Sequence, residues 1–84
     1  MSLREHTNRE YEGELRKLRD QLLRMGAKVE EIISGSIKAL LERDTDLATR
    51  MIASDRRINQ MEVDIDGLCL SILARRQPVA SDLR

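Results

Sequence analysis

The repeat that decides the fold lies in residues 47–72, which read LATRMIASDRRINQMEVDIDGLCLSI. Mostly apolar side chains recur there at alternating steps of four and three residues, which is the heptad pattern of a helix that packs against another helix. The positions are Leu47, Met51, Ser54, Ile58, Met61, Ile65, Leu68 and Ile72. Asp44 before the repeat suits a helix cap, and Arg75 and Arg76 suit the negative end of a helix. The pattern predicts a helix over about residues 45–75.

A second heptad repeat lies upstream of the first and has the same spacing. Its members are Tyr11, Leu15, Leu18, Leu22, Met25, Val29 and Ile32. The run Thr7-Asn8-Arg9-Glu10 has the spacing of a capping box, so we expect this helix to begin near Thr7. We expect it to end near Arg43, which makes it roughly 35 residues and ~50 Å long.

A polar break of four residues, Arg43-Asp44-Thr45-Asp46, separates the two repeats. So short a connection is compatible only with antiparallel neighbours. The sequence therefore predicts an all-α fold, a long antiparallel helical hairpin. The side chains expected to be buried between the helices are Leu15, Leu22, Val29, Met51, Ile58, Ile65 and Ile72.

Further apolar side chains widen both stripes beyond what two helices can cover against each other. They include Leu23, Ile33, Ile37 and Leu73. Either a third helix is missing, or the chain forms an oligomer, for which a four-helix assembly is expected. Pro78 ends the second helix, and Ser81 with Asp82 has the form of a new helix start at residues 81–84. This suggests a truncated chain; the alternative is a frayed tail with a chance Ser-Asp pair.

Composition excludes several classes of protein. Among 84 residues Tyr11 is the one aromatic residue, which argues against a β-sandwich and against a surface that stacks bases. Basic and acidic residues number 15 each, and no basic stripe for nucleic acid stands out along the sequence. Cys69 is the one cysteine, and no apolar run approaches a membrane span. We therefore expect a protein of a reducing compartment.

Few residues are candidates for chemistry. With one histidine, His6, and one cysteine, Cys69, a catalytic triad or zinc site within the chain is implausible. We interpret His6 as a solvated residue before the first helix and Cys69 as a small buried apolar residue. The four glycines are expected to let helices approach closely; they are Gly13, Gly26, Gly35 and Gly67.

One polar group of residues shares a face of the second helix. Asp55, Asn59, Glu62 and Asp66 follow one another at steps of four, three and four, beside the apolar repeat. Glu62 and Asp66 lie one turn apart, and two carboxylates at that spacing can share a cation. From the residues alone, a solvated helix face is favoured over a metal site.

The end of the chain resembles the PhoU family. The resemblance is carried by Glu62-Val63-Asp64-Ile65-Asp66 and by Arg76-Gln77-Pro78-Val79-Ala80-Ser81-Asp82-Leu83-Arg84. Tyr11-Glu12-Gly13-Glu14-Leu15, Met25-Gly26 and Asp55-Arg56-Arg57-Ile58-Asn59 are also similar to that family's first two helices. The resemblance implies a fold of two three-helix bundles. Residues 1–84 would then be a partial PhoU domain: two helices and the start of a third.

The resemblance also implies a function. Proteins of this family are cytoplasmic regulators, without enzyme activity, that restrain phosphate uptake and the phosphate-starvation response. Their partners are the ATPase subunit of the phosphate-specific ABC transporter and a membrane sensor histidine kinase. They reach the membrane through these partners and bind no nucleic acid, and a homo-oligomer is expected.

The metal site is implied in the same way. The family's ExxxD motifs hold iron, zinc or another divalent metal between two helices, and no cofactor is required. Glu62 and Asp66 match the motif of the second helix, while its counterpart would lie beyond Arg84. Two alternatives stay open: a generic helical oligomerisation module, and a metal-dependent enzyme that uses the same two carboxylates.

Overall fold

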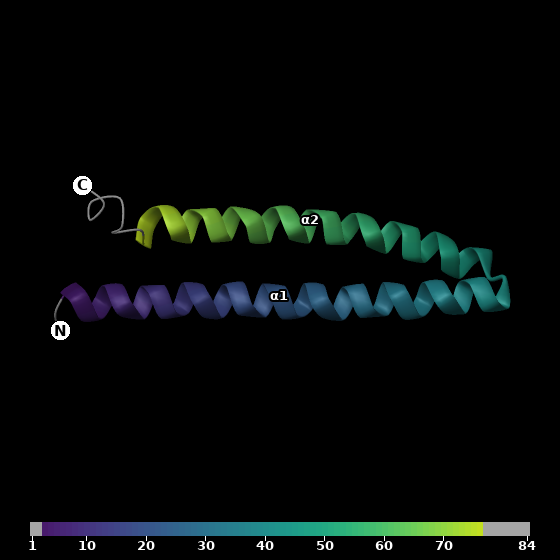
Figure 1. The fold of residues 1–84 in the computed structure, drawn as a ribbon, viewed down its shortest axis with the longest axis horizontal. Coiled ribbons are helices and arrows are strands. Elements are labelled where there is room, and N and C mark those ends of the chain that lie inside the picture. The colour runs from purple at the N-terminus through teal and green to yellow at the C-terminus, as the bar shows by residue number, and fades with distance from the viewer. Residues whose placement is uncertain (1–2, 77–84) are drawn as a thin grey trace.

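The computed structural model describes residues 3–76, with the side chains of residues 8–76. This part of the chain forms two helices, α1 (Leu3–Glu42) and α2 (Thr45–Arg76), and contains no strand. The helices run side by side in opposite directions, so that the start of α1 and the end of α2 lie at the same end (Figure 1). The prediction of an all-α antiparallel hairpin is therefore confirmed.

The start of α1 differs from the expectation. The helix begins at Leu3, so Thr7 lies inside it and cannot serve as its cap, and His6 is a helical residue. Residues 3–6 include neither glycine nor proline, so nothing in them breaks the helix. The expected helix start at residues 81–84 lies outside the described residues.

The turn between the helices is two residues long, Arg43 and Asp44, rather than four. Arg43 adopts a left-handed conformation with φ of 53°, and the amide of Asp44 donates to the carbonyl of Ala39 at 2.9 Å. This is the Schellman arrangement that ends many helices. The Asp44 carboxylate then accepts from the amide of Leu47 at 3.0 Å, as the expected cap of α2.

The core of the hairpin is one line of side chains between the helices. Ile58, Ile65 and Ile72 of α2 are buried, as the heptad predicts, together with Ala39 of α1. Met51, two turns before Ile58, is half-buried and lies directly on Gly35 of α1. Only Gly35 among the four glycines allows a close approach between the helices, because the other three meet no atom of the opposite helix.

The inward face of α1 is rotated relative to the expectation. Leu15 and Leu22 were expected inside the seam, yet 41% and 46% of their surface is exposed, and Val29 is only half-buried. Glu14 and Gln21, one residue before these leucines, are half-buried instead, and Gly35 contacts Met51. Leu18, Met25 and Ile32 of the expected repeat stay half-buried. The bulky side chains of α2 explain this rotation of α1. Met51 and the buried isoleucines of α2 need space between the helices, and small or flexible side chains of α1 leave that space.

Candidate functional surface

A groove of about 590 Å³ opens between the helices beside the turn. Ser36, Ala39 and Ala48 line it, and their small side chains leave space between the helices. Leu40 of α1 and Ile52 of α2 line it as well. The groove therefore marks one side of the hairpin on which both helices present apolar atoms.

The same side continues along the whole hairpin. Residues seven apart in the sequence lie at nearly the same angle around a helix. Counting in sevens from the residues that line the groove therefore identifies the residues on the same side of the hairpin. We call it the apolar flank; on α1 it comprises Leu15, Leu22, Val29, Ile33, Ser36 and Leu40, and on α2 Ala48, Ile52, Cys69 and Leu73. The exposed members include Leu22, Ile33, Leu40, Ile52 and Leu73. An apolar surface of this length is typical of a contact site for protein.

The acidic residues predicted from the spacing lie on this flank. Asp55 lines the groove, and steps of seven from Asp55 and Ile52 lead to Glu62 and to Asn59 and Asp66. All four side chains are exposed. The structure thus brings Asp55, Asn59, Glu62 and Asp66 together as one acidic strip on α2, alongside the apolar side chains of α1.

The strip contains two carboxylates one helical turn apart, Glu62 and Asp66. Glu62 and Asp66 offer oxygen ligands of the kind that hard divalent cations prefer, yet such ions take about six ligands. Within the described part of the chain, no three His, Cys, Asp or Glu side chains come together in a way that could hold a metal. The two carboxylates therefore fit a metal only if another segment or chain supplies further ligands. Cys69, on the same flank, is a free and half-buried thiol.

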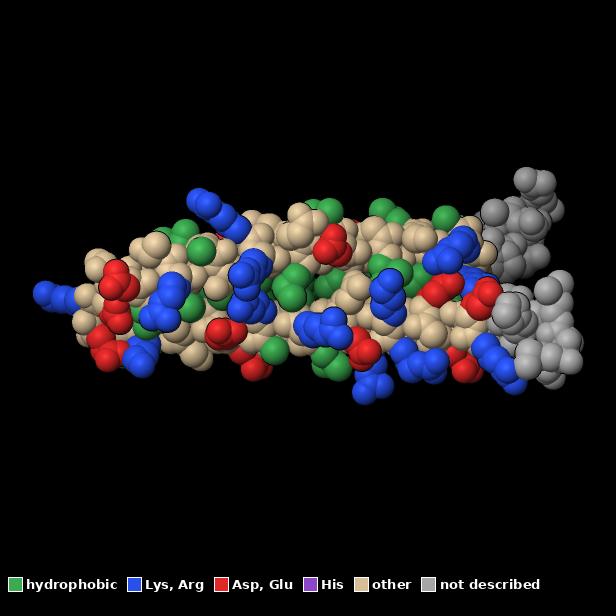
Figure 2. Space-filling model, turned by 180° about the vertical axis from the view of Figure 1, so that it is seen from behind, with side chains coloured by type: hydrophobic (Ala, Val, Ile, Leu, Met, Phe, Trp, Pro, Cys, Tyr) green, Lys and Arg blue, Asp and Glu red, His purple; other side chains and the backbone are tan. Residues whose placement is uncertain are grey.

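The opposite side of the hairpin is rich in cations. A hollow of about 180 Å³ there is lined by Gln21, Arg24, Met61, Asp64 and Ile65. Steps of seven from Arg24 and Asp64 give the other members of this basic flank: Lys17, Glu31, Lys38, Arg50 and Arg57. Figure 2 shows a face on which Lys and Arg side chains lie along the line where the helices meet. Because basic and acidic residues are balanced along the sequence, the sequence does not reveal that the basic ones gather on one side of the hairpin.

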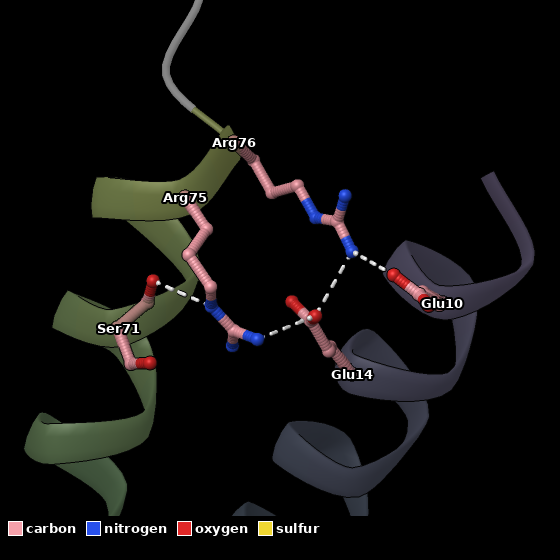
Figure 3. A network of polar contacts seen from close by, with 5 residues as sticks. All are labelled: Glu10, Glu14, Ser71, Arg75 and Arg76. Atoms are coloured by element: carbon pink, nitrogen blue, oxygen red, sulfur yellow. Dashed lines mark hydrogen bonds and ion pairs between the residues drawn. The ribbon is translucent and has the colours of Figure 1, made fainter. Parts of the chain in front are cut away.

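An ion-pair cluster joins the helices at the end opposite the turn (Figure 3). One oxygen of Glu14 accepts from Arg76 at 3.0 Å and pairs with Arg75 at 3.1 Å. Arg76 also lies 3.6 Å from a carboxylate oxygen of Glu10 and 5.7 Å from the centre of the Tyr11 ring. The side chains of Glu14 and Arg76 are only 16% and 18% exposed.

The sequence did not predict this cluster. From the sequence alone, Arg75 and Arg76 are assigned only to the negative end of the helix dipole. The sequence does contain an indication of the cluster: Glu14 lies four residues before Leu18 of the heptad repeat, so both share one face of the helix. Because Glu14 is half-buried in the seam, it needs a cationic partner, and the end of α2 supplies two.

The described helices contain no stretch that is apolar enough and long enough to cross a membrane. This agrees with the exposed polar side chains that both helices carry along their length.

Comparison with known proteins assigns the chain to a family. Residues 22–84 match the family model described as the PhoU domain. The phosphate-specific transport system accessory protein PhoU of Escherichia coli K12 is 44% identical over 84 residues, which cover 100% of this chain and 35% of that protein. The homologue from Pseudomonas putida is 47% identical over 83 residues, 99% of this chain and 32% of that protein.

A more distant homologue, from Caulobacter vibrioides, is 36% identical over 80 residues, 95% of this chain and 35% of that protein. The chain thus spans about a third of the length of the curated relatives that it matches. No solved structure matches it. The family model covers both the end of α1 and all of α2, and the similarity to full relatives extends over the rest of the chain, so the chain belongs to the PhoU family.

Proposed function

We propose that this chain is part of a regulatory accessory protein that restrains phosphate uptake and the phosphate-starvation response in the cytoplasm. The observation that carries the proposal is the match of residues 22–84 to the PhoU domain, together with relatives named for the phosphate-specific transport system. The partners proposed are the ATPase subunit of the phosphate ABC transporter and a membrane sensor histidine kinase. The protein acts by contact rather than by catalysis.

The surface of the hairpin supports a role in protein contacts. The apolar flank presents large aliphatic side chains to solvent along α1 and near both ends of α2, and the basic flank lies on the other side of the seam. Apolar surfaces of this extent are typical of protein interfaces. Opposite flanks of different character allow two partners to be contacted at once.

A chimera tests the proposal in cells. The 84 residues replace the matching segment of the Escherichia coli relative, and phosphate uptake and a starvation-response reporter are measured in phosphate-rich medium. We expect the chimera to hold the reporter low, as the native relative does. A reporter that stays high, despite normal levels of folded chimera, contradicts the proposal. It then favours the alternative of a generic helical oligomerisation module, for which the exposed apolar flank is the supporting observation.

We further propose that Glu62 and Asp66 supply half of a site for iron, zinc or another divalent metal. The support is the oxygen donor set of the two carboxylates, which lie one turn apart on the acidic strip and are exposed. The chain alone then binds metal weakly, while the chimera with its additional segments binds it well. Replacing both residues by Ala abolishes metal binding and changes stability by no more than about 0.5 kcal/mol, because both are exposed.

Metal analysis of the purified chimera, with and without the two substitutions, is the measurement. The matched control replaces Asp64, an exposed acid on the basic flank of the same helix, by Ala. If the metal content of the double variant equals that of the control, Glu62 and Asp66 belong to a solvated helix face.

A further inference from the structure

A sulfur atom lies at the close contact between the helices beside the turn. A Cβ atom on Gly35 would have the Cγ of Met51 at 3.1 Å and its Cε at 3.2 Å, and the Sδ atom is nearer than either. The thioether of Met51 thus fills the space that the missing side chain of Gly35 leaves. None of the other three glycines has a methionine atom within 4 Å. The packing of the helices at this level therefore depends on the size and polarity of one thioether.

The same side chain can be reached from solvent. Met51 is half-buried and lines the groove of about 590 Å³ beside the turn. A water molecule takes up about 30 Å³ in the liquid, so the groove admits a solute as small as hydrogen peroxide. The other side chains that line the groove are aliphatic, hydroxylated or charged, and Met51 is the one among them that peroxide oxidises readily. Peroxide that enters the groove therefore meets a single target.

We propose that Met51 is a site of reversible oxidation, at which hydrogen peroxide converts the thioether to a sulfoxide and loosens the hairpin beside the turn. The sulfur gives up two electrons and forms a bond to one oxygen of the peroxide. The O–O bond breaks, and the second oxygen leaves as water with both protons. Methionine sulfoxide reductases, which draw electrons from a thiol reductant, restore the thioether. The proposal does not use the phosphate function, so its failure leaves that function untouched.

The added oxygen is incompatible with the contact on Gly35. A sulfoxide is a strong hydrogen-bond acceptor, whereas the backbone amides of α1 around Gly35 already donate within the helix. A buried acceptor without a donor is costly, so the side chain has to turn its oxygen toward the groove, where solvent and the hydroxyl of Ser36 supply donors. Oxidation therefore exchanges the contact between Met51 and Gly35 for a solvated side chain, and it places a polar group on the apolar flank.

Two further methionines in the seam provide an internal comparison. Met25 and Met61 are half-buried like Met51, and neither lies within 4 Å of the Cβ position of a glycine. Met61 lines the smaller hollow of about 180 Å³ on the basic flank, and Met25 lines neither opening. We therefore expect Met51 to be oxidised faster than Met61, and its oxidation to have the larger effect on stability.

The test treats the 84-residue chain with hydrogen peroxide and follows two readouts. Mass spectrometry of proteolytic peptides locates each added oxygen, and circular dichroism at one fixed chain concentration gives the melting temperature. Cys69→Ala is present throughout, because the free thiol of Cys69 also reacts with peroxide. The melting temperature is expected to fall by roughly 5 °C in step with the oxidation of Met51. Treatment with methionine sulfoxide reductases and dithiothreitol is expected to reverse the fall.

Met51→Leu and Met61→Leu are the matched variants, because each removes one thioether from the seam and keeps a similar volume. The fall in melting temperature is expected to persist in Met61→Leu and to be mostly lost in Met51→Leu. If Met51→Leu has less helix before treatment, the repair of the parent chain by the reductases decides the test. The proposal is overturned if Met51 is oxidised no faster than Met61. It is also overturned if full oxidation of Met51 leaves the melting temperature unchanged, or if both variants lose stability equally in peroxide.

Discussion

At the scale of single residues, the turn depends on Arg43 and Asp44. Arg43 adopts a positive φ that suits glycine, whereas Asp44 has the side chain that the start of α2 requires. One residue of the turn is therefore unfavourable for its conformation, and its neighbour is well suited.

Replacing Arg43 by Gly is expected to stabilise the hairpin by about 1 kcal/mol, because glycine adopts the left-handed conformation without steric cost. Replacing Asp44 by Ala is expected to destabilise it by about 1 kcal/mol, because the amide of Leu47 loses its acceptor. Urea unfolding at one fixed chain concentration measures both. Effects of the same sign for the two variants contradict the turn geometry.

Gly35 is the glycine that the packing requires. A Cβ atom there meets the side chain of Met51, with its Cγ at 3.1 Å, whereas a Cβ at Gly67 meets nothing within 4 Å. Gly67→Ala is expected to stabilise the hairpin by about 1 kcal/mol through helix propensity. Gly35→Ala is expected to lose that gain because Met51 must move. Equal gains in urea unfolding refute the close contact between Gly35 and Met51.

At the scale of the elements, the sequence predicts α2 better than α1. The apolar residues of α2 that follow the predicted repeat include Ile58, Ile65 and Ile72, which are buried. The apolar residues of α2 outside the repeat are exposed: Ile52, Val63, Leu70 and Leu73. Those of α1 form a wide stripe, and periodicity alone cannot divide it between the seam and a further partner. In the structure, Leu15 and Leu22 lie in the exposed part of this stripe. Gly35 and Glu14 face α2 instead, because Met51 packs on Gly35 and Arg76 pairs with Glu14.

For the candidate site as well, features that depend on one helix can be predicted from the sequence, and features that depend on both helices cannot. The acidic strip depends only on spacing within α2; its four side chains are exposed, and Asp55 lines the groove. The apolar and basic flanks and the ion-pair cluster depend on how α1 is rotated against α2. That rotation is a property of the packed pair, so the sequence of either helix does not contain it.

The two arginines of the ion-pair cluster are expected to differ in importance. Arg76 is only 18% exposed and contacts Glu14, Glu10 and Tyr11, whereas Arg75 is 53% exposed. Arg76→Ala is expected to cost about 1.5 kcal/mol, because Glu14 is left half-buried with weaker pairing. Arg75→Ala is expected to cost less than about 0.5 kcal/mol, as exposed ion pairs do. Urea unfolding measures both, and a larger loss for Arg75→Ala contradicts the geometry.

At the scale of the whole molecule, a hairpin only 14 Å thick has one line of buried side chains and two open faces. If a second copy covers the apolar flank, stability depends on chain concentration. The melting temperature of the native chain is expected to rise as the chain is concentrated, and that of Leu40→Lys to stay nearly constant. Melting curves by circular dichroism over a hundredfold concentration range provide the measurement. A native melting temperature that does not change contradicts self-association.

The two ends of the hairpin also differ in how much chain lies between their contacts. Met51 and Gly35 meet close to the turn, while Arg76 and Glu14 are separated by 62 residues. Closing a short loop costs less conformational entropy than closing a long one, so the helices pair first beside the turn and the ion pairs form last. Opening proceeds in the reverse order. Backbone amides near the ion-pair cluster are therefore expected to exchange with solvent through brief local openings, whereas the hydrogen-bonded amides of Asp44 and Ala48 at the turn are expected to exchange more slowly.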